Sequence, residues 1–196
     1  MKRSSLAAAV AVYFVGGTTT LHAQYDLGTP GFLGIAGGAT LSELSSSNGS
    51  TPTRWGGMAG LLLGRRITQG VAALLEVNWM QQGGGDTRLE YVDVPLTVGT
   101  ILRRGTLRFR PYLGVGIGFK SGCASPTPGL CNEASEEQWT LPLGFTVGHL
   151  TAPHGWLLGA DVRYAIPLSQ ALDNSAVYNR SWQFRLLLAK PTGTPR

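Results

Sequence analysis

The stretch that decides the fold is LRFRPYLGVGIGFK, from Leu107 to Lys120. Its odd-numbered positions are all apolar, and its even-numbered positions are all charged, small or hydroxyl-bearing. This strict alternation predicts a β-strand, because successive side chains point to opposite faces of a sheet. An ordinary globular strand has about five or six residues, whereas about nine to eleven tilted residues cross a bilayer. The stretch is therefore long enough to be a membrane-spanning strand.

Other parts of the chain repeat this alternation less strictly, at 31–44, 54–65, 71–80, 89–102, 138–150, 155–168 and 181–189. With the first stretch they make an even number of strands, as single-chain barrels of the bacterial outer membrane have. The sequence predicts an all-β fold, an eight-stranded antiparallel up-and-down transmembrane β-barrel.

The expected connections also alternate in length. Those at 68–70, 104–105 and 152–153 are short, whereas longer polar ones fall at 45–53, 81–88, 121–137 and 169–180. This matches barrels with short periplasmic turns and long extracellular loops. The apolar face is even-numbered before Arg104-Gly105, odd-numbered after it, and even-numbered again after Ala152-Pro153. Two-residue hairpins require this change if facing residues are to share one side of the sheet.

The tryptophans give an independent indication of a membrane. With the N-terminus on the periplasmic side, Trp55, Trp79, Trp139 and Trp182 fall at the extracellular rim and Trp156 at the opposite rim. Membrane interfaces favour such rings, because they are apolar with a polar handle. We predict that these five residues are membrane-interface aromatics.

The face opposite the apolar one carries charged residues: Glu76, Asp93, Arg108, Arg110, Asp161, Arg163 and Arg185. A soluble ligand-binding barrel such as a lipocalin has the reverse arrangement, with an apolar interior. Placing these charges in a core with no apolar filling, and the aliphatic face in water, would be costly. We therefore expect the charges to line the lumen and to form a network of salt bridges.

The N-terminus resembles an export signal. Lys2 and Arg3 precede an apolar run from Leu6 to Val15, and a small residue follows at Ala23. This pattern predicts a signal peptide at 1–23, since the run is about half the length of a spanning helix. We expect a barrel domain at 24–190, a short tail at 191–196, and location in the bacterial outer membrane.

The charge balance argues against a nucleic-acid partner. The chain has 16 basic and 11 acidic residues, and two of the basic ones lie in the expected signal peptide. No basic run is interleaved with aromatic residues, as nucleic-acid binding would favour.

Two cysteines, Cys123 and Cys131, fall in one of the expected long loops. In an oxidising compartment they are expected to form a disulfide that closes this loop. The alternative is a pair of unpaired thiols. A metal site is less favoured, because no His or second Cys pair is close by. We expect no metal and no cofactor.

Prolines interrupt the expected strands at Pro95, Pro111, Pro142 and Pro167. A closed barrel has no free edge to accept a residue without an N–H group. We expect a β-bulge or a locally lost hydrogen bond near each proline.

Three motifs carry a family resemblance: YVDVPLTVG (Tyr91–Gly99), RPYLGVGIGF (Arg110–Phe119) and DVRYAIPL (Asp161–Leu168). They resemble small outer-membrane barrels grouped around the PorT-like family, with an OmpA-like transmembrane barrel. The resemblance implies insertion by the barrel-assembly machinery, and its motifs specify no ligand. Such barrels usually end in an aromatic residue that is recognised during assembly, whereas this chain continues past Leu188 to Arg196.

No chemical motif points to catalysis. Gly114, Gly116 and Gly118 recur on one strand face, whereas a phosphate-binding loop needs a strand-turn-helix context. They are better explained as small lumen-facing residues that make room for Tyr and Arg. His149 and His154 have no evident Ser or carboxylate partner. We therefore predict that the protein is not an enzyme.

Three function classes remain open. The favoured one is a structural or interaction barrel whose loops contact an extracellular protein or glycan, since loops commonly carry specificity. The second is a narrow passive pore, which is disfavoured because eight strands leave an interior only wide enough for side chains. The third is a lipid-modifying enzyme of the outer membrane.

Overall fold

The computed structural model describes residues 31–47, 49–151, 155–173 and 176–192. The expected signal peptide, the turn at 152–153, His154 and the last four residues of the expected tail lie outside these ranges. Eight long strands make up the fold: β1 (Gly31–Ser46), β3 (Arg54–Arg66), β4 (Val71–Gly84), β5 (Thr87–Thr100), β7 (Leu107–Ala124), β8 (Glu137–Leu150), β9 (Leu157–Pro167) and β10 (Tyr178–Thr192). The shorter elements are β2 (Gly49–Ser50), β6 (Leu102–Arg104) and the helix α1 (Leu130–Glu133).

The long strands close into a barrel. Each pairs antiparallel with its neighbour in chain order, and β10 returns to pair with β1 from Gly31 opposite Thr192 to Ser45 opposite Tyr178. Closure leaves no free sheet edge, which is the condition for crossing a bilayer with strands. The predicted fold class, an eight-stranded antiparallel transmembrane barrel, is confirmed.

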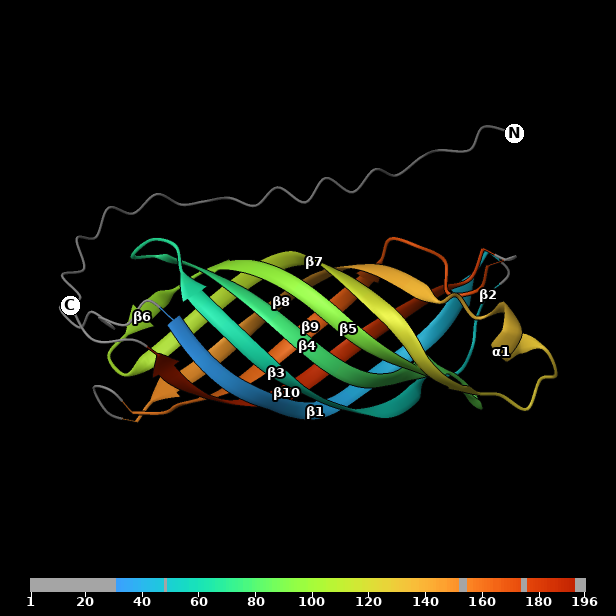
Figure 1. Cartoon of the computed structure of the whole chain (residues 1–196), viewed down its shortest axis with the longest axis horizontal. Coiled ribbons are helices and arrows are strands. Elements are labelled where there is room, and N and C mark those ends of the chain that lie inside the picture. The colour runs from blue at the N-terminus through green and yellow to red at the C-terminus, as the bar shows by residue number, and fades with distance from the viewer. Residues whose placement is uncertain (1–30, 48, 152–154, 174–175, 193–196) are drawn as a thin grey trace, which may run out of the picture.

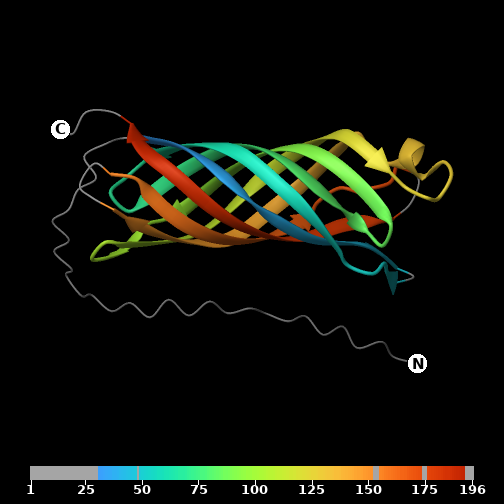
Figure 2. The ribbon, with the colours of Figure 1, turned by 90° about the horizontal axis from the view of Figure 1, so that it is seen from below.

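The two ends of the barrel differ (Figure 1). We call one the turn end: it holds Gly31, Thr192, the connections 67–70 and 105–106, and the described residues 151 and 155–156. The other is the loop end, with the connections 85–86 and 125–136 and the described residues 47, 49–53, 168–173 and 176–177. Figure 2 shows the same elongated tube from below, with α1 at the loop end.

An apolar belt covers the outside of the barrel. Large hydrophobic side chains are exposed on every long strand, among them Leu113 at 61% and Leu186 at 68%. All five predicted interface tryptophans are exposed as well. A continuous apolar surface of this kind would be unfavourable in water. In the described ranges, no helix is long and apolar enough to cross a membrane.

One predicted loop is wrong. The segment 81–88 is not a long connection, because β4 continues to Gly84 and β5 begins at Thr87. Glycine makes this tight hairpin possible: Gly83 has φ 128° and Gly85 has φ 54°, conformations that other residues rarely adopt. The polar residues that suggested a loop continue the paired strands beyond the apolar belt. Similarly, β10 begins at Tyr178, earlier than expected, and extends through Thr192.

The prolines interrupt the ladders without shifting them. Pairing with β4 is absent at Pro95, and pairing with β7 is absent at Pro142, although the register is the same on both sides of each gap. β5 ends at Thr100, opposite Pro111, and the strand resumes as β6. Pro167 is the last residue of β9. Of the two accommodations expected from the sequence, these sites use a local loss of pairing rather than a bulge.

The interior has three layers. The lower apolar layer, at the turn end, consists of Ala36, Leu62, Leu74, Leu187 and Ala189, with Phe32 and Leu157 packed against it. The upper apolar layer, at the loop end, consists of Leu44, Met58, Met80, Leu89, Tyr91, Ala134, Ala171 and Leu172. Buried charges lie between the two. The alternation predicted the charges, but not the apolar layers above and below them.

Candidate functional site

The middle of the lumen is filled by a cluster that we call the central plug: Glu76, Tyr112, Asp161, Arg163 and Arg185. These residues come from β4, β7, β9 and β10. They point inward because each occupies the strand parity opposite the exposed apolar residues. Arg185 lies opposite Asp161 in the β9–β10 ladder, so the two are cross-strand neighbours.

Glu76 joins the two arginines of the plug. Arg163 donates from Nη2 to Oε1 of Glu76 over 2.5 Å. Arg185 donates from Nη1 to the other oxygen, Oε2. Asn78 adds a hydrogen bond from Nδ2 to Oε2 over 3.0 Å. Both oxygens of this carboxylate therefore accept hydrogen bonds, as a buried charge requires.

Asp161 makes the other half of the plug. Arg185 donates to its Oδ1 from Nη2 over 2.7 Å and from Nε over 2.9 Å. Tyr112 donates its hydroxyl to Oδ2 over 2.8 Å, and Thr146 does so over 2.7 Å. The Tyr112 hydroxyl in turn accepts from Nε of Arg163 over 3.0 Å. The two carboxylates and two guanidinium groups form one connected unit.

The plug is withdrawn from solvent. The side chains of Glu76, Asp161, Arg163 and Arg185 are at most 1% exposed. Two negative and two positive charges balance, which is what makes such burial tolerable. Gly144 leaves room for the Tyr112 hydroxyl, because a Cβ added at Gly144 would lie 2.4 Å from that oxygen.

Three of the seven predicted network residues lie outside these ion pairs. Arg110 donates to Oγ1 of Thr97 over 2.8 Å, and its guanidinium lies 4.7 Å from the Tyr112 ring centre. Arg108 donates to the main-chain oxygen of Gly105 over 2.6 Å. Asp93 is buried, and in the described ranges no ion pair to it is found. The seven predicted residues therefore do not form a single network of ion pairs. Arg108 and Arg110 lie toward the turn end and pair with neither carboxylate of the plug.

Two loops cover the lumen at the loop end, and we call their described residues the loop-end cap (125–136, 168–173 and 176–177). Ala134 forms an isolated bridge with Leu172, and the Ser135 N–H donates to the Ala171 carbonyl over 2.9 Å. Ala134, Ala171 and Leu172 are buried in the upper apolar layer. Lys120 supports the cap from β7 by donating Nζ to the Ala134 carbonyl over 2.6 Å. The long loops are thus partly committed to packing.

The disulfide expected between Cys123 and Cys131 is present, with the Cα atoms 5.6 Å apart. It connects the end of β7 to α1, and Cys123 packs against the upper apolar layer. The bond therefore fastens one loop of the cap to the barrel wall.

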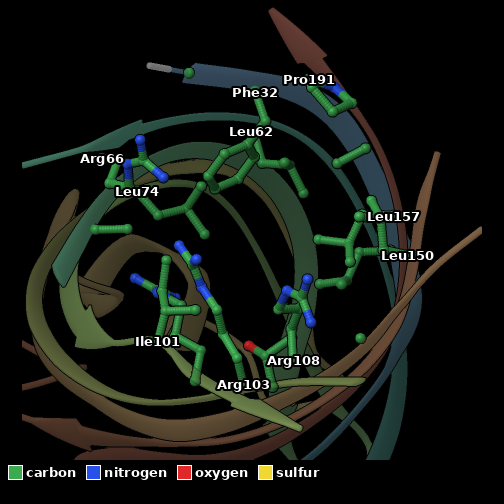
Figure 3. A pocket seen from close by; sticks show the side chains of 17 residues that line it. Phe32, Leu62, Arg66, Leu74, Ile101, Arg103, Arg108, Leu150, Leu157 and Pro191 are labelled. Atoms are coloured by element: carbon green, nitrogen blue, oxygen red, sulfur yellow. The ribbon is translucent and has the colours of Figure 1, made fainter. Parts of the chain in front are cut away.

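A hollow lies inside the turn end, between the lower apolar layer and a group of arginines (Figure 3). We call it the turn-end pocket. It measures about 980 Å³ including its open mouth, and its wall includes Phe32, Leu62, Leu74, Leu157 and Leu187. Arg66, Arg103, Arg108 and Arg110 line it as well.

No metal-binding cluster is found in the part of the chain that the structure describes. It contains no group of three or more His, Cys, Asp or Glu residues placed to hold a metal ion. His149 is exposed near the turn end, on the outward face of β8. Gly116 and Gly118 face Asp93 and Tyr91, consistent with small residues that make room for larger ones.

Sequence reasoning missed two sets of residues. Asn78, Tyr112 and Thr146 hydrogen-bond to the plug carboxylates and lie on the strand face that points inward. They carry no charge, so the pattern of charged residues did not indicate them. The lower apolar layer was signalled by breaks in the alternation. In the triple-leucine runs Leu61–Leu63 and Leu186–Leu188, the central residue faces inward.

Comparisons with known proteins agree on the fold. Neisserial surface protein A superposes with a TM-score of 0.52 at 16% identity, covering 83% of this chain and 97% of that one. OprG from Pseudomonas aeruginosa gives 0.55 at 14% identity, over 85% and 97%. The outer membrane enzyme PagL gives 0.50 at 10% identity, over 83% and 99%. No protein-family model matches the chain, and no curated protein does. The chain therefore has the fold of small outer-membrane barrels, and the PorT-like resemblance stays a prediction.

The plug generates a stability prediction. Asp161→Ala leaves Arg185 without one of its two carboxylate partners, and should lower the free energy of unfolding by about 3–5 kcal/mol. Asp93→Ala is the matched control, because it removes a buried lumen carboxylate that forms no ion pair in the described ranges. Its loss in free energy of unfolding should be clearly smaller. Urea unfolding of both variants in the same detergent measures the difference. Equal losses would contradict the special position of Asp161.

The cap generates a second prediction. The native protein should resist alkylation by iodoacetamide until it is reduced. The double variant Cys123→Ser, Cys131→Ser should still give a folded barrel that migrates faster unheated than boiled on a denaturing gel. Protease should cut its 125–136 loop sooner, because the disulfide that fastens α1 to β7 is lost. Two reactive thiols in the unreduced native protein would refute this.

Proposed function

We propose that this chain is an integral protein of the bacterial outer membrane, exported by a cleaved signal peptide and inserted by the barrel-assembly machinery. Its role is structural or interactive rather than catalytic, in keeping with the PorT-like resemblance. The barrel acts as a rigid base, the lumen conducts no solute, and the loop end contacts the partner. The turn end then faces the periplasm, as short turns do in such barrels.

The observation that carries this proposal is the blocked lumen. The charged side chains of the central plug are at most 1% exposed, with apolar layers above and below them and two loops packed over the loop end. An aqueous pore would leave its lining charges in contact with water, as porin interiors do. Buried, mutually paired charges instead support a barrel held shut by its own side chains.

The outer surface of the loop end favours a partner with a basic surface. Its exposed acidic residues in the described ranges are Asp86, Glu133, Glu136, Glu137 and Asp173. They outnumber Arg88 and Arg180, the basic residues there with exposed side chains, although Glu136 is paired with Lys120 over 2.6 Å. Complementary charge steers association and selects partners. Of the two partner classes that the sequence leaves open, this acidity favours a basic protein over an acidic glycan.

Conductance separates this proposal from the pore alternative. Protein recovered from the outer-membrane fraction and inserted into a planar bilayer should give no stable single-channel current, because the plug leaves no continuous water path. The double variant Glu76→Ala, Asp161→Ala provides the comparison, since it removes both carboxylates that hold the arginines in place, and its occasional currents would show that insertion was successful. Stable ohmic currents from the unaltered protein, together with a changed ion selectivity in Asp161→Ala, would establish the pore.

A further inference from the structure

The turn-end pocket combines an apolar wall with a group of cations. Its wall is largely apolar, built from inward-facing side chains of the lower apolar layer. Four arginines line the same space, and none of the described residues that line it is an Asp or Glu. An apolar hollow with charges of one sign at one end matches a ligand with an apolar tail and an anionic head.

The arginines converge from separate strands. Arg66 ends β3, Arg103 belongs to β6, and Arg108 lies near the start of β7. Figure 3 shows their guanidinium groups projecting into the opening that Phe32, Leu62 and Leu74 also border. Three strands therefore present cations to one small volume.

Two of these cations are direct neighbours. Arg103 and Arg108 are paired across the β6–β7 ladder, so their side chains emerge on the same face at the same level. Like charges at directly opposed positions destabilise a sheet. Arg103 also donates from Nη2 to the Gln69 carbonyl over 3.4 Å, and none of the described residues in the pocket wall is an Asp or Glu. An anion between the two guanidinium groups would remove this repulsion.

The buried arginines also retain donors without acceptors. Arg108 is 7% exposed and Arg110 is 8% exposed. Arg108 uses Nη1 on main-chain oxygens, and Arg110 uses Nη2 on Thr97, but the Nε atom of each has no hydrogen-bond partner among the described residues. Buried donors of a charged group are normally satisfied. The two guanidinium groups that line the hollow therefore do not use all of their hydrogen-bonding capacity.

Other cations at the turn end face outward instead of into the pocket. Arg65, Arg104 and Lys190 are exposed at the same end of the barrel, on the outward parity. These residues are placed to meet lipid headgroups around the barrel. Arg66 and Arg103, one position away, face the lumen instead. Contact with the surrounding bilayer therefore does not account for the inward arginines.

We propose that the turn-end pocket binds a free fatty acid. The carboxylate lies among Arg66, Arg103 and Arg108, where guanidinium groups can grip it in the bidentate manner that suits arginine. The single acyl chain lies against Leu62, Leu74 and Leu187, on the turn-end side of the central plug. The space inside the hollow that a water molecule can reach is about 110 Å³, and the enclosing barrel wall admits one chain more readily than the two of a phospholipid. This inference is independent of what the loop end contacts.

Native mass spectrometry with dodecanoate as the probe tests the proposal. The folded protein, released from a nonionic detergent, should carry one saturable dodecanoate adduct. Dodecanol and dodecyltrimethylammonium have the same chain but lack the negative charge, and should give little or no adduct. The double variant Arg103→Gln, Arg108→Gln should bind at least about tenfold more weakly, as the loss of charge-assisted hydrogen bonds implies.

The chain supplies a matched control in Arg65→Gln, Arg104→Gln, which removes two cations from the outward face and should leave the adduct unchanged. Ala189→Phe provides a second, independent arm, because it fills the apolar part of the pocket and should abolish binding without altering charge. Faster migration of unheated samples on a denaturing gel verifies that each variant is folded. Equal adducts in all variants, equal binding of the cationic probe, or several unsaturable adducts would each overturn the proposal.

Discussion

The structure depends on one constraint, which is that Arg163 and Arg185 are buried in the middle of a closed tube. Neither guanidinium can reach water, so each must be matched by a buried carboxylate. Glu76 and Asp161 provide that match, and Tyr112 links the two halves. Because these residues come from four strands, their pairing also fixes how those strands are arranged around the lumen. The same contacts that neutralise the charge close the passage.

The layers on either side follow from this arrangement. Toward the loop end, apolar side chains and two packed loops cover the plug, and the disulfide between Cys123 and Cys131 fastens one of those loops. Toward the turn end, the apolar layer stops short of filling the lumen, and arginines face the remaining space. A barrel closed in its centre thus has two separate surfaces: an acidic exterior at the loop end and a cationic pocket at the turn end.

Alternation carried most of the fold prediction, because a strand with one face in lipid and one in the lumen must alternate. It placed each long strand and gave the parity of Glu76, Asp161, Arg163 and Arg185. It failed at 81–88, where polar residues continue a hairpin beyond the bilayer and glycines make the tight turn. Polarity alone does not distinguish that arrangement from a loop.

Pairing inside the lumen could not be predicted in the same way. Parity says that a side chain points inward, but not at what height it lies or which residue it meets across the tube. Arg108 and Arg110 share the face of Arg163, yet the stagger of the strands places them in the turn-end pocket instead. The apolar layers were visible only as faults in the pattern, such as the inward-facing Leu62 and Leu187 within leucine runs.

The central claim is that the buried ions act as one coupled unit, and a double-mutant cycle on Glu76 and Arg185 tests it most directly. Glu76→Gln, Arg185→Met and the double variant are unfolded in urea under identical conditions, and the three losses in free energy are compared. Coupling predicts that the double variant loses at least about 1 kcal/mol less than the sum of the single variants, as for residues in contact. Losses that add to within about 0.5 kcal/mol, as for independent sites, would contradict the account.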